Sequence, residues 1–231
     1  MGVRFAVNEV NRDHTVNSAH KTKTDYRLYL VTDRDCLANR DLYESIEQAI
    51  RGGVTLIQLR EKLVSSREFL DIAFAVKEIT SRYQIPLIIN DRLDIALAIE
   101  ADGLHIGQDD LPLTVVRKLF GKDKIIGVSA STLDEAILAE QQGADYLGVG
   151  AMYATPTKLD AKTVSLEQLA VIKRSVSIPV VAIGGINETN VRDIMATGIE
   201  GVSVVSAILA KQDVQKAAKD LLEIIKGKFA D

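Results

Sequence analysis

An apolar run that ends abruptly in polar side chains is the first sign of chemistry in this sequence. The segment PLIINDRLDIA, residues 86–96, begins as a buried strand would, and Asn90, Asp91 and Arg92 follow with no turn residue between. Amide and carboxylate groups are costly to bury without partners. A strand that ends in them is therefore a candidate wall of a functional site.

A second run, VTLIQL at residues 54–59, leads into cationic residues. Gln58, Arg60 and Lys62 are two residues apart, and side chains at that spacing point in one direction when the backbone is extended. The later segment YATPTK adds Lys158. These cations could together bind an anionic group such as a diphosphate.

Carboxylates accompany these cations. Asp110 follows the run GLHIG, just as Asp91 follows the run PLIIN. Mg²⁺ is typically held by one or two carboxylates together with substrate phosphates and water, so this pair suits a Mg²⁺-diphosphate. The alternative is that the same charges form two surface salt bridges, and spacing alone does not decide between the two.

The last two apolar runs suggest a separate phosphate site. PVVAI ends in Gly184 and Gly185, where bare backbone can approach a ligand, and GVSVV ends in Val205 before Ser206 at the expected start of a helix. Free backbone amides and a helix dipole both favour an anion. The alternative is that the glycines only relieve packing.

The elements that position these residues alternate between two periods. Segments of helical period such as SREFLDIAFAVKEITSRY separate eight short β-branched or aliphatic runs: residues 26–32, 54–59, 86–90, 103–107, 125–129, 146–150, 179–183 and 201–205. Eight such units predict an α/β fold, a single-domain (β/α)8 TIM barrel. A doubly wound open sheet uses the same alternation, but it usually has fewer strands and a glycine-rich first turn, which is absent here.

In such a barrel, function lies where the strands run into the following loops. The polar residues described above, with Ser129 and the pair Thr155 and Thr157, all follow predicted strands. We therefore expect one active-site mouth in a barrel domain of residues 26–231. Residues 1–25 lack a strong apolar pattern and are predicted to be a partly disordered or capping extension.

Composition limits the partners and the cellular location that we expect for this protein. The 28 basic and 32 acidic residues give a formal charge of −4, which favours neither nucleic acid nor an anionic membrane as a partner. No apolar run approaches the length of about 20 residues that a membrane span needs. Cys36 is the only cysteine, which excludes an internal disulfide and fits a reducing, cytoplasmic location.

Six motifs in order resemble the thiamine phosphate synthase family: QLREK (58–62), NDRLDIALAIEADGLHIGQDDLP (90–112), GVS (127–129), TPTK (155–158), GGI (184–186) and VVSAI (204–208). The resemblance runs from Tyr26 to about residue 210. It implies a (β/α)8 transferase that joins hydroxymethylpyrimidine diphosphate to hydroxyethylthiazole phosphate and releases diphosphate with Mg²⁺. The implied partners are small-molecule substrates, and a homo-oligomer is left open.

The resemblance also implies roles for individual residues. Asp91 and Asp110 would bind Mg²⁺. The catalytic set would be Arg60, Lys62, Ser129 and Lys158. The pyrimidine diphosphate would contact those four together with Gln58 and Asn90, and the thiazole phosphate would contact Thr155, Thr157, Gly185, Val205 and Ser206. His105 receives no role.

Two other functions remain as alternatives. A thiazole tautomerase-like barrel would share the thiazole phosphate site, but it would have no use for Arg60, Asp91 or Asp110. A non-catalytic sensor of a phosphate ligand would leave the paired aspartates unexplained. With no Ser-His-Asp set or other nucleophile at the expected mouth, covalent catalysis lacks a candidate, and electrostatic stabilisation of departing diphosphate is expected instead.

Overall fold

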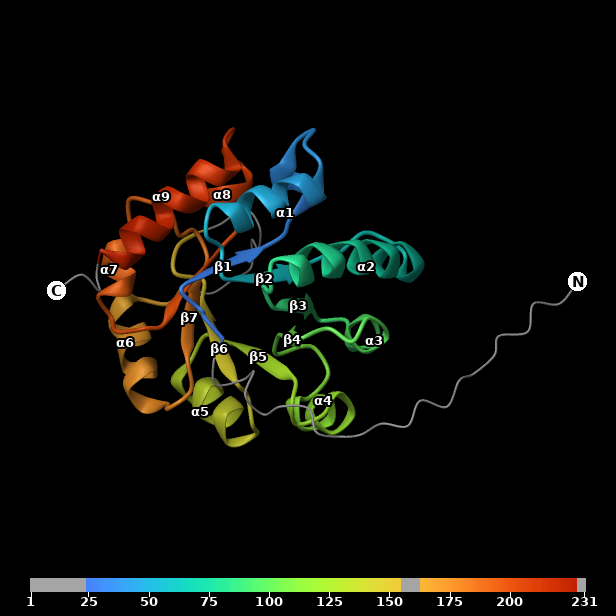
Figure 1. The fold of residues 1–231 in the computed structure, drawn as a ribbon. Helices are drawn as coiled ribbons and strands as arrows, with labels where there is room; N and C mark the ends of the chain where they lie inside the picture. Colours follow the sequence, from blue (N-terminus) through green and yellow to red (C-terminus); the bar gives the residue numbers. More distant parts are fainter. Residues whose placement is uncertain (1–23, 155–162, 228–231) are drawn as a thin grey trace, which may run out of the picture.

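The described strands close into a barrel. A computed structural model describes residues 24–154 and 163–227, and within these ranges eight parallel strands pair in chain order, with β1 pairing to β8 (Figure 1). The strands are β1 (Leu28–Val31), β2 (Leu56–Leu59), β3 (Leu87–Asn90), β4 (Gly103–Ile106), β5 (Ile125–Ala130), β6 (Tyr146–Gly150), β7 (Val180–Ile183) and β8 (Gly201–Val204). The predicted TIM barrel is confirmed, and the open sheet is excluded.

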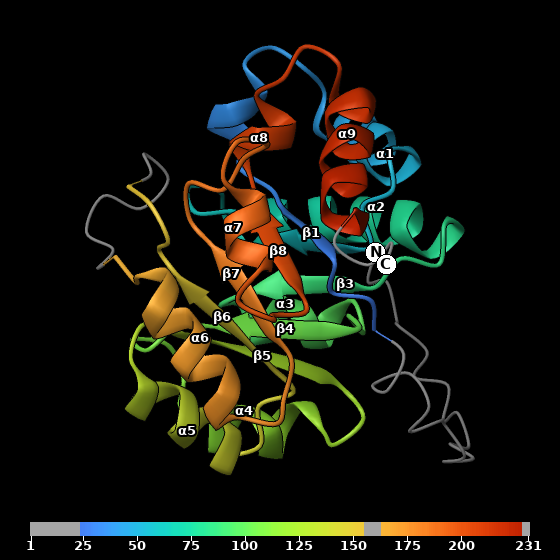
Figure 2. The same cartoon turned by 90° about the vertical axis from the view of Figure 1, so that its left-hand side faces the viewer.

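Helices surround the barrel, as Figure 2 shows from the side. They are η2 (Arg34–Leu37), α1 (Leu42–Arg51), α2 (Ser66–Arg82), α3 (Leu93–Ala98), α4 (Leu113–Phe120), α5 (Leu133–Gln141), α6 (Leu166–Ser175), α7 (Val191–Met195), α8 (Ser206–Leu209) and α9 (Val214–Lys226). Several begin at a side-chain cap, and Thr132 and Glu135 form a reciprocal capping box at α5. None of the helices in the described residues is long and apolar enough to cross a membrane.

Two apolar cores result from the alternation of side chains along each strand. Outward residues such as Leu30, Ile57 and Ile89 pack under the helices in the larger core. The smaller core fills the barrel itself, and we call it the interior cluster: Tyr26, Tyr29, Leu56, Ile88, Ile125, Tyr146 and Val181. The barrel is therefore closed from below and can hold a ligand only near the carboxyl ends of its strands.

Glycines on the strands make room for the largest interior rings. A Cβ at Gly127 would lie 2.0 Å from the Tyr146 ring, and one at Gly148 would lie 2.9 Å from His105 Cε1. Gly127 thus leaves space for the Tyr146 ring and Gly148 for the His105 ring. A larger residue at either glycine would displace the ring beside it.

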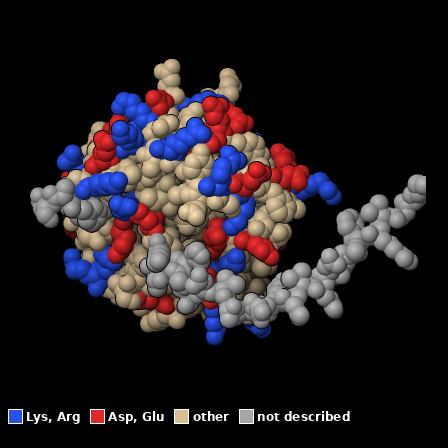
Figure 3. Space-filling model, in the orientation of Figure 1, with Lys and Arg blue, Asp and Glu red and all other residues tan. Residues whose placement is uncertain are grey.

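Some predictions concern residues outside the described ranges. Most of the extension predicted at residues 1–25 is among these, so its boundary with the barrel domain stays a prediction. Thr155, Thr157 and Lys158 also lie outside them. On the face drawn in Figure 3, acidic and basic side chains are interspersed. Some oppositely charged side chains pair at the surface, as Arg51 does with Glu47.

Candidate active site

A pocket of about 620 Å³ opens at the carboxyl ends of the strands, where the barrel fold predicts function. Eight residues predicted from the sequence line it: Gln58, Arg60, Lys62, Asn90, Asp91, Asp110, Ser129 and Val205. Gly185 and Ser206 are described but are not among its lining residues. The structure therefore brings most of the predicted site together on one cavity.

The cations at the pocket are oriented by carboxylates. Arg60 Nη1 lies 3.1 Å from Asp33 Oδ2, and Lys62 Nζ lies 2.5 Å from Asp91 Oδ2. Glu61, between them, pairs instead with Arg34. The period-two expectation for this segment is confirmed, because Arg60 and Lys62 line the pocket and Glu61 does not. Asp33 was missed, since nothing in the sequence connects it to Arg60.

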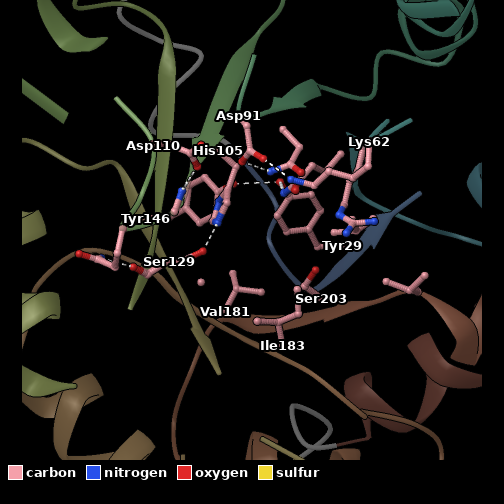
Figure 4. Close-up of a pocket in the computed structure, with 18 of the residues that line it drawn as sticks. Tyr29, Lys62, Asp91, His105, Asp110, Ser129, Tyr146, Val181, Ile183 and Ser203 are labelled. Atoms are coloured by element: carbon pink, nitrogen blue, oxygen red, sulfur yellow. Dashed lines mark hydrogen bonds and ion pairs between the residues drawn. The ribbon is translucent and has the colours of Figure 1, made fainter. Parts of the chain in front are cut away.

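Two carboxylates share one side of the pocket (Figure 4). Asp91 has a left-handed backbone, with φ of 60°, and its amide donates to the His105 carbonyl over 2.8 Å. Asp110 Oδ2 accepts from the Gly107 amide at 2.7 Å. Burial raises the pKa of Asp110, and the nearby charge of Asp91 acts in the same direction, against the hydrogen bond from Gly107. Such a pair gains when a cation lies between its members.

These donors fit Mg²⁺ better than a metal held by protein alone. No group of three or more His, Cys, Asp or Glu residues forms a metal cage within the described ranges. Mg²⁺ needs fewer, because substrate phosphates and water complete its octahedron. Asp91 and Asp110, with Lys62 beside them, match that requirement.

A chain of buried hydrogen bonds crosses the pocket floor. Gln58 Nε2 donates to the Tyr29 hydroxyl at 2.6 Å, and that oxygen lies 2.9 Å from the Tyr146 hydroxyl. His105 then bridges Tyr146, 2.9 Å from Nδ1, and Ser129 Oγ, 2.9 Å from Nε2. Burial lowers the pKa of His105 to about 4, so the imidazole is neutral near pH 7.

The opposite wall of the pocket is apolar. Val181 and Ile183 of β7 lie there with Ser203 of β8, facing the carboxylates in Figure 4. The Ser203 hydroxyl oxygen is buried and has no hydrogen-bond partner among the described residues. The cavity is thus lined by charged groups on one side and by mostly apolar groups on the other, which suits a ring that carries an anionic tail.

Packing and backbone conformation explain both glycines of the predicted phosphate site. Gly184 and Gly185 both have positive φ, 101° and 64°, which favours glycine. A Cβ on Gly184 would lie 2.6 Å from the Ala151 Cβ, and one on Gly185 would lie 2.7 Å from the Tyr153 Cβ. Both positions therefore require glycine whether or not a phosphate binds, and the phosphate site stays a prediction.

Sequence reasoning missed the groups that form the floor of the pocket. In the sequence, Tyr29 and Tyr146 are indistinguishable from ordinary strand positions, and His105 received no predicted role. One signal could have found them: each is a polar aromatic residue on the inward face of a predicted barrel strand. Their hydrogen bonds to one another depend on the closure of the barrel.

Comparisons with known proteins identify the family of this chain. Residues 28–208 match the family model described as Thiamine monophosphate synthase. Thiamine-phosphate synthase of Clostridium acetobutylicum is 60% identical over 202 residues, which span 87% of this chain and 96% of that protein. The enzyme of the same name from Ruminiclostridium cellulolyticum is 57% identical over 208 residues, or 90% of this chain and 99% of that protein.

Solved structures give the same result. Thiamine phosphate pyrophosphorylase from Pyrococcus furiosus superposes with a TM-score of 0.82 at 40% identity, covering 88% of this chain and 97% of that chain. A 3-hexulose-6-phosphate synthase, at 17% identity and a TM-score of 0.65, shares the fold alone. On the family match and the identities above, this chain belongs to the thiamine monophosphate synthase family.

Proposed function

We propose that this chain joins 4-amino-2-methyl-5-hydroxymethylpyrimidine diphosphate to 4-methyl-5-hydroxyethylthiazole phosphate, giving thiamine phosphate and diphosphate. The two relatives described above are named for that activity, and this chain matches them over most of their length. The observation that carries the proposal is the pocket itself, a cavity of about 620 Å³ lined by the cations Arg60 and Lys62 and by carboxylates that include Asp91 and Asp110. Both substrates are small molecules, and we place the reaction in the cytoplasm.

The charged mouth would hold the diphosphate. Arg60, Lys62 and Lys158 would contact its oxygens, and Asp91 and Asp110 would hold Mg²⁺. When bound, Mg²⁺ would neutralise part of the charge that grows on the diphosphate. Asp33 would keep the Arg60 guanidinium facing the pocket, because the two are already paired at 3.1 Å.

The chamber below would hold the pyrimidine ring. Gln58, Asn90 and Ser129 would contact it, and Val181 and Ile183 would pack against its face. Departure of diphosphate breaks the bond between the methylene carbon and the bridging oxygen, and the electron pair leaves with the diphosphate. The electron-rich aminopyrimidine bears the resulting cation, and the thiazole nitrogen then donates its lone pair to form the new carbon–nitrogen bond. Water must stay out until then.

The thiazole phosphate would occupy the side of the pocket near β8. Val205 lines the cavity there, and Ser206 begins the following helix. Thr155, Thr157 and Gly185 complete the proposed contacts. The family motifs TPTK, GGI and VVSAI support this part of the proposal.

A coupled assay tests the reaction. The full chain with both substrates and Mg²⁺ should release diphosphate and form thiamine phosphate in equal amounts, as measured by chromatography. Chelation of Mg²⁺ should abolish turnover. A tautomerase would act on a thiazole phosphate alone with no need of Mg²⁺, and a sensor would bind ligand without releasing diphosphate; either result would overturn the proposal.

A further inference from the structure

The buried hydrogen-bond chain joins two proposed substrate contacts that are distant in sequence. Gln58 of β2 stands at one end and Ser129 of β5 at the other. Tyr29, Tyr146 and His105 lie between them, each at most 8% exposed. Neither the family motifs nor the proposed reaction gives these three residues a role.

The direction of the chain follows from the number of hydrogens available. A neutral imidazole has one donor and one acceptor nitrogen, and a tyrosine hydroxyl has one hydrogen to donate. Gln58 Nε2 already donates to Tyr29. If Tyr29 donates to Tyr146, and Tyr146 to His105 Nδ1, then every hydrogen within the chain has an acceptor.

The reverse direction leaves a hydrogen without an acceptor. Ser129 would donate to His105 Nε2, His105 Nδ1 to Tyr146, and Tyr146 to Tyr29. Tyr29 would then accept from both Tyr146 and Gln58, and its own buried hydroxyl hydrogen would find no acceptor in the chain. Such an unpaired donor is unfavourable in a buried site, so the amide of Gln58 favours the first direction.

We propose that the Gln58 amide sets the direction of this chain, so that His105 carries its hydrogen on Nε2 and Ser129 points its hydroxyl hydrogen at the substrate ring. The inference rests on the proposed function. It assigns Tyr29, Tyr146 and His105 as positioning residues, and it names what Ser129 recognises: an acceptor nitrogen of a heteroaromatic ring. The Gln58 carbonyl oxygen is left to accept from a donor such as an amino group. An aminopyrimidine offers both groups.

The tautomer of His105 is measurable in the free protein. The chain has three histidines, so ¹⁵N-histidine labelling with a His105→Asn variant for assignment gives one set of ring signals to follow. A long-range ¹H–¹⁵N correlation should find the hydrogen on Nε2 in the wild type. Gln58→Glu, whose carboxylate can only accept, should move it to Nδ1. A hydrogen on Nδ1 in the wild type, or the same tautomer in both proteins, overturns the inference.

Kinetics then test whether the chain acts through Ser129. Tyr146→Phe removes the donor to His105 and should raise KM for the pyrimidine diphosphate about tenfold. Tyr83→Phe is the matched control, since its hydroxyl bonds Glu47 and Arg51 on the outer surface, and KM should not change. In a Ser129→Ala background, Tyr146→Phe should have little further effect. Additive losses would overturn the inference.

Two failures can be told apart. If the wild type forms no thiamine phosphate, the proposed function is wrong, whereas the direction of the chain is still read from the His105 signals. If the wild type is active and the tautomer or the double-mutant result is opposite to that expected, only the inference is wrong. Should Tyr146→Phe fail to fold, the wild-type spectrum still decides the direction.

Discussion

The inward face of the β2 segment carries opposite chemistry at its two ends. Leu56 belongs to the interior cluster and is fully buried, whereas Arg60, four residues later, lines the pocket and pairs with Asp33. The same change occurs on β3 between Ile88 and Asn90. Each strand thus contributes to folding at one end and to ligand binding at the other, and a substitution at either end should affect mainly one of the two.

We call the interior cluster the lower layer and the charged pocket mouth the upper layer. Between these two layers lies a boundary layer that has features of both. Tyr29 and Tyr146 belong to the interior cluster through their rings, and their hydroxyls belong to the hydrogen-bond chain on the pocket floor. Their rings also pack edge to face, with centroids 6.0 Å apart. Here folding and binding depend on the same residues, so the separation of roles should be least complete.

The largest effect is expected where two charges of the mouth act on one ion. Asp91→Ala or Asp110→Ala should each lower kcat/KM about 10³-fold, since either removes a ligand that the proposed Mg²⁺ needs. The double variant should be little worse than the worse single variant, because residues that act as a unit are non-additive. Steady-state kinetics of the four proteins measure this.

The Mg²⁺ dependence of the same proteins provides the control. Raising Mg²⁺ should partly restore the single variants by mass action. If Asp91 and Asp110 only form separate salt bridges, the two losses would be roughly additive and added Mg²⁺ would restore nothing. That outcome would mean that Asp91 and Asp110 do not hold a shared Mg²⁺.

The next effect concerns the lower layer. Leu56→Ala removes a fully buried side chain from the interior cluster and should lower the free energy of unfolding by about 2–5 kcal/mol. The kcat/KM of the protein that remains folded should change little, because Leu56 does not line the pocket. Urea unfolding and kinetics below the transition check both halves. A large loss of activity in fully folded protein would contradict the separation.

Arg60→Gln is the matching change at the upper end of the same segment. It should lower kcat about 10²-fold through loss of one charge-assisted contact to the departing diphosphate. The melting temperature should change little, because the guanidinium is partly exposed and its ion pair among the described residues is with Asp33. Full activity, or a melting temperature that falls in step with activity, would show that Arg60 serves the fold instead.

The sequence was sufficient for the layer that follows local rules. Short β-branched or aliphatic runs between helical segments predicted all eight strands, because parallel strands buried on both faces are nearly continuous in apolar residues. In a barrel of parallel strands all the carboxyl ends lie on one face, so polar residues at strand ends were predicted to share one pocket. Gln58, Arg60, Asp91 and Asp110 do share it. These predictions needed only the direction of side chains along one strand and the polarity of the barrel.

Contacts between distant strands could not be predicted in this way. The pairing of Arg60 with Asp33 and the contact of His105 with Tyr146 depend on which side chains meet after the barrel closes. Gly127 illustrates the limit. In sequence it is a break in an apolar run, whereas in the structure it leaves the space that the Tyr146 ring fills.

The smallest predicted effect tests the boundary layer through pH. His105 has a pKa of about 4 in the folded protein, against 6.5 for an ordinary histidine, because it is buried. Between these values the unfolded chain binds a proton that the folded protein does not, so stability should fall as the pH drops below 6.5. From pH 7.5 to 5.5 this single group should account for a loss of about 1 kcal/mol.

A matched variant isolates that contribution. His105→Gln keeps a polar side chain but cannot titrate, and the other two histidines and all carboxylates are common to both proteins. Urea unfolding at the two pH values should therefore show a loss about 1 kcal/mol larger in the wild type than in the variant, whatever the absolute stability of each. Equal losses would mean that His105 is protonated about as easily when folded as when unfolded. The residue would then belong with the exposed charges of the mouth rather than with the buried floor. The boundary between the two layers would then lie below His105 on β4.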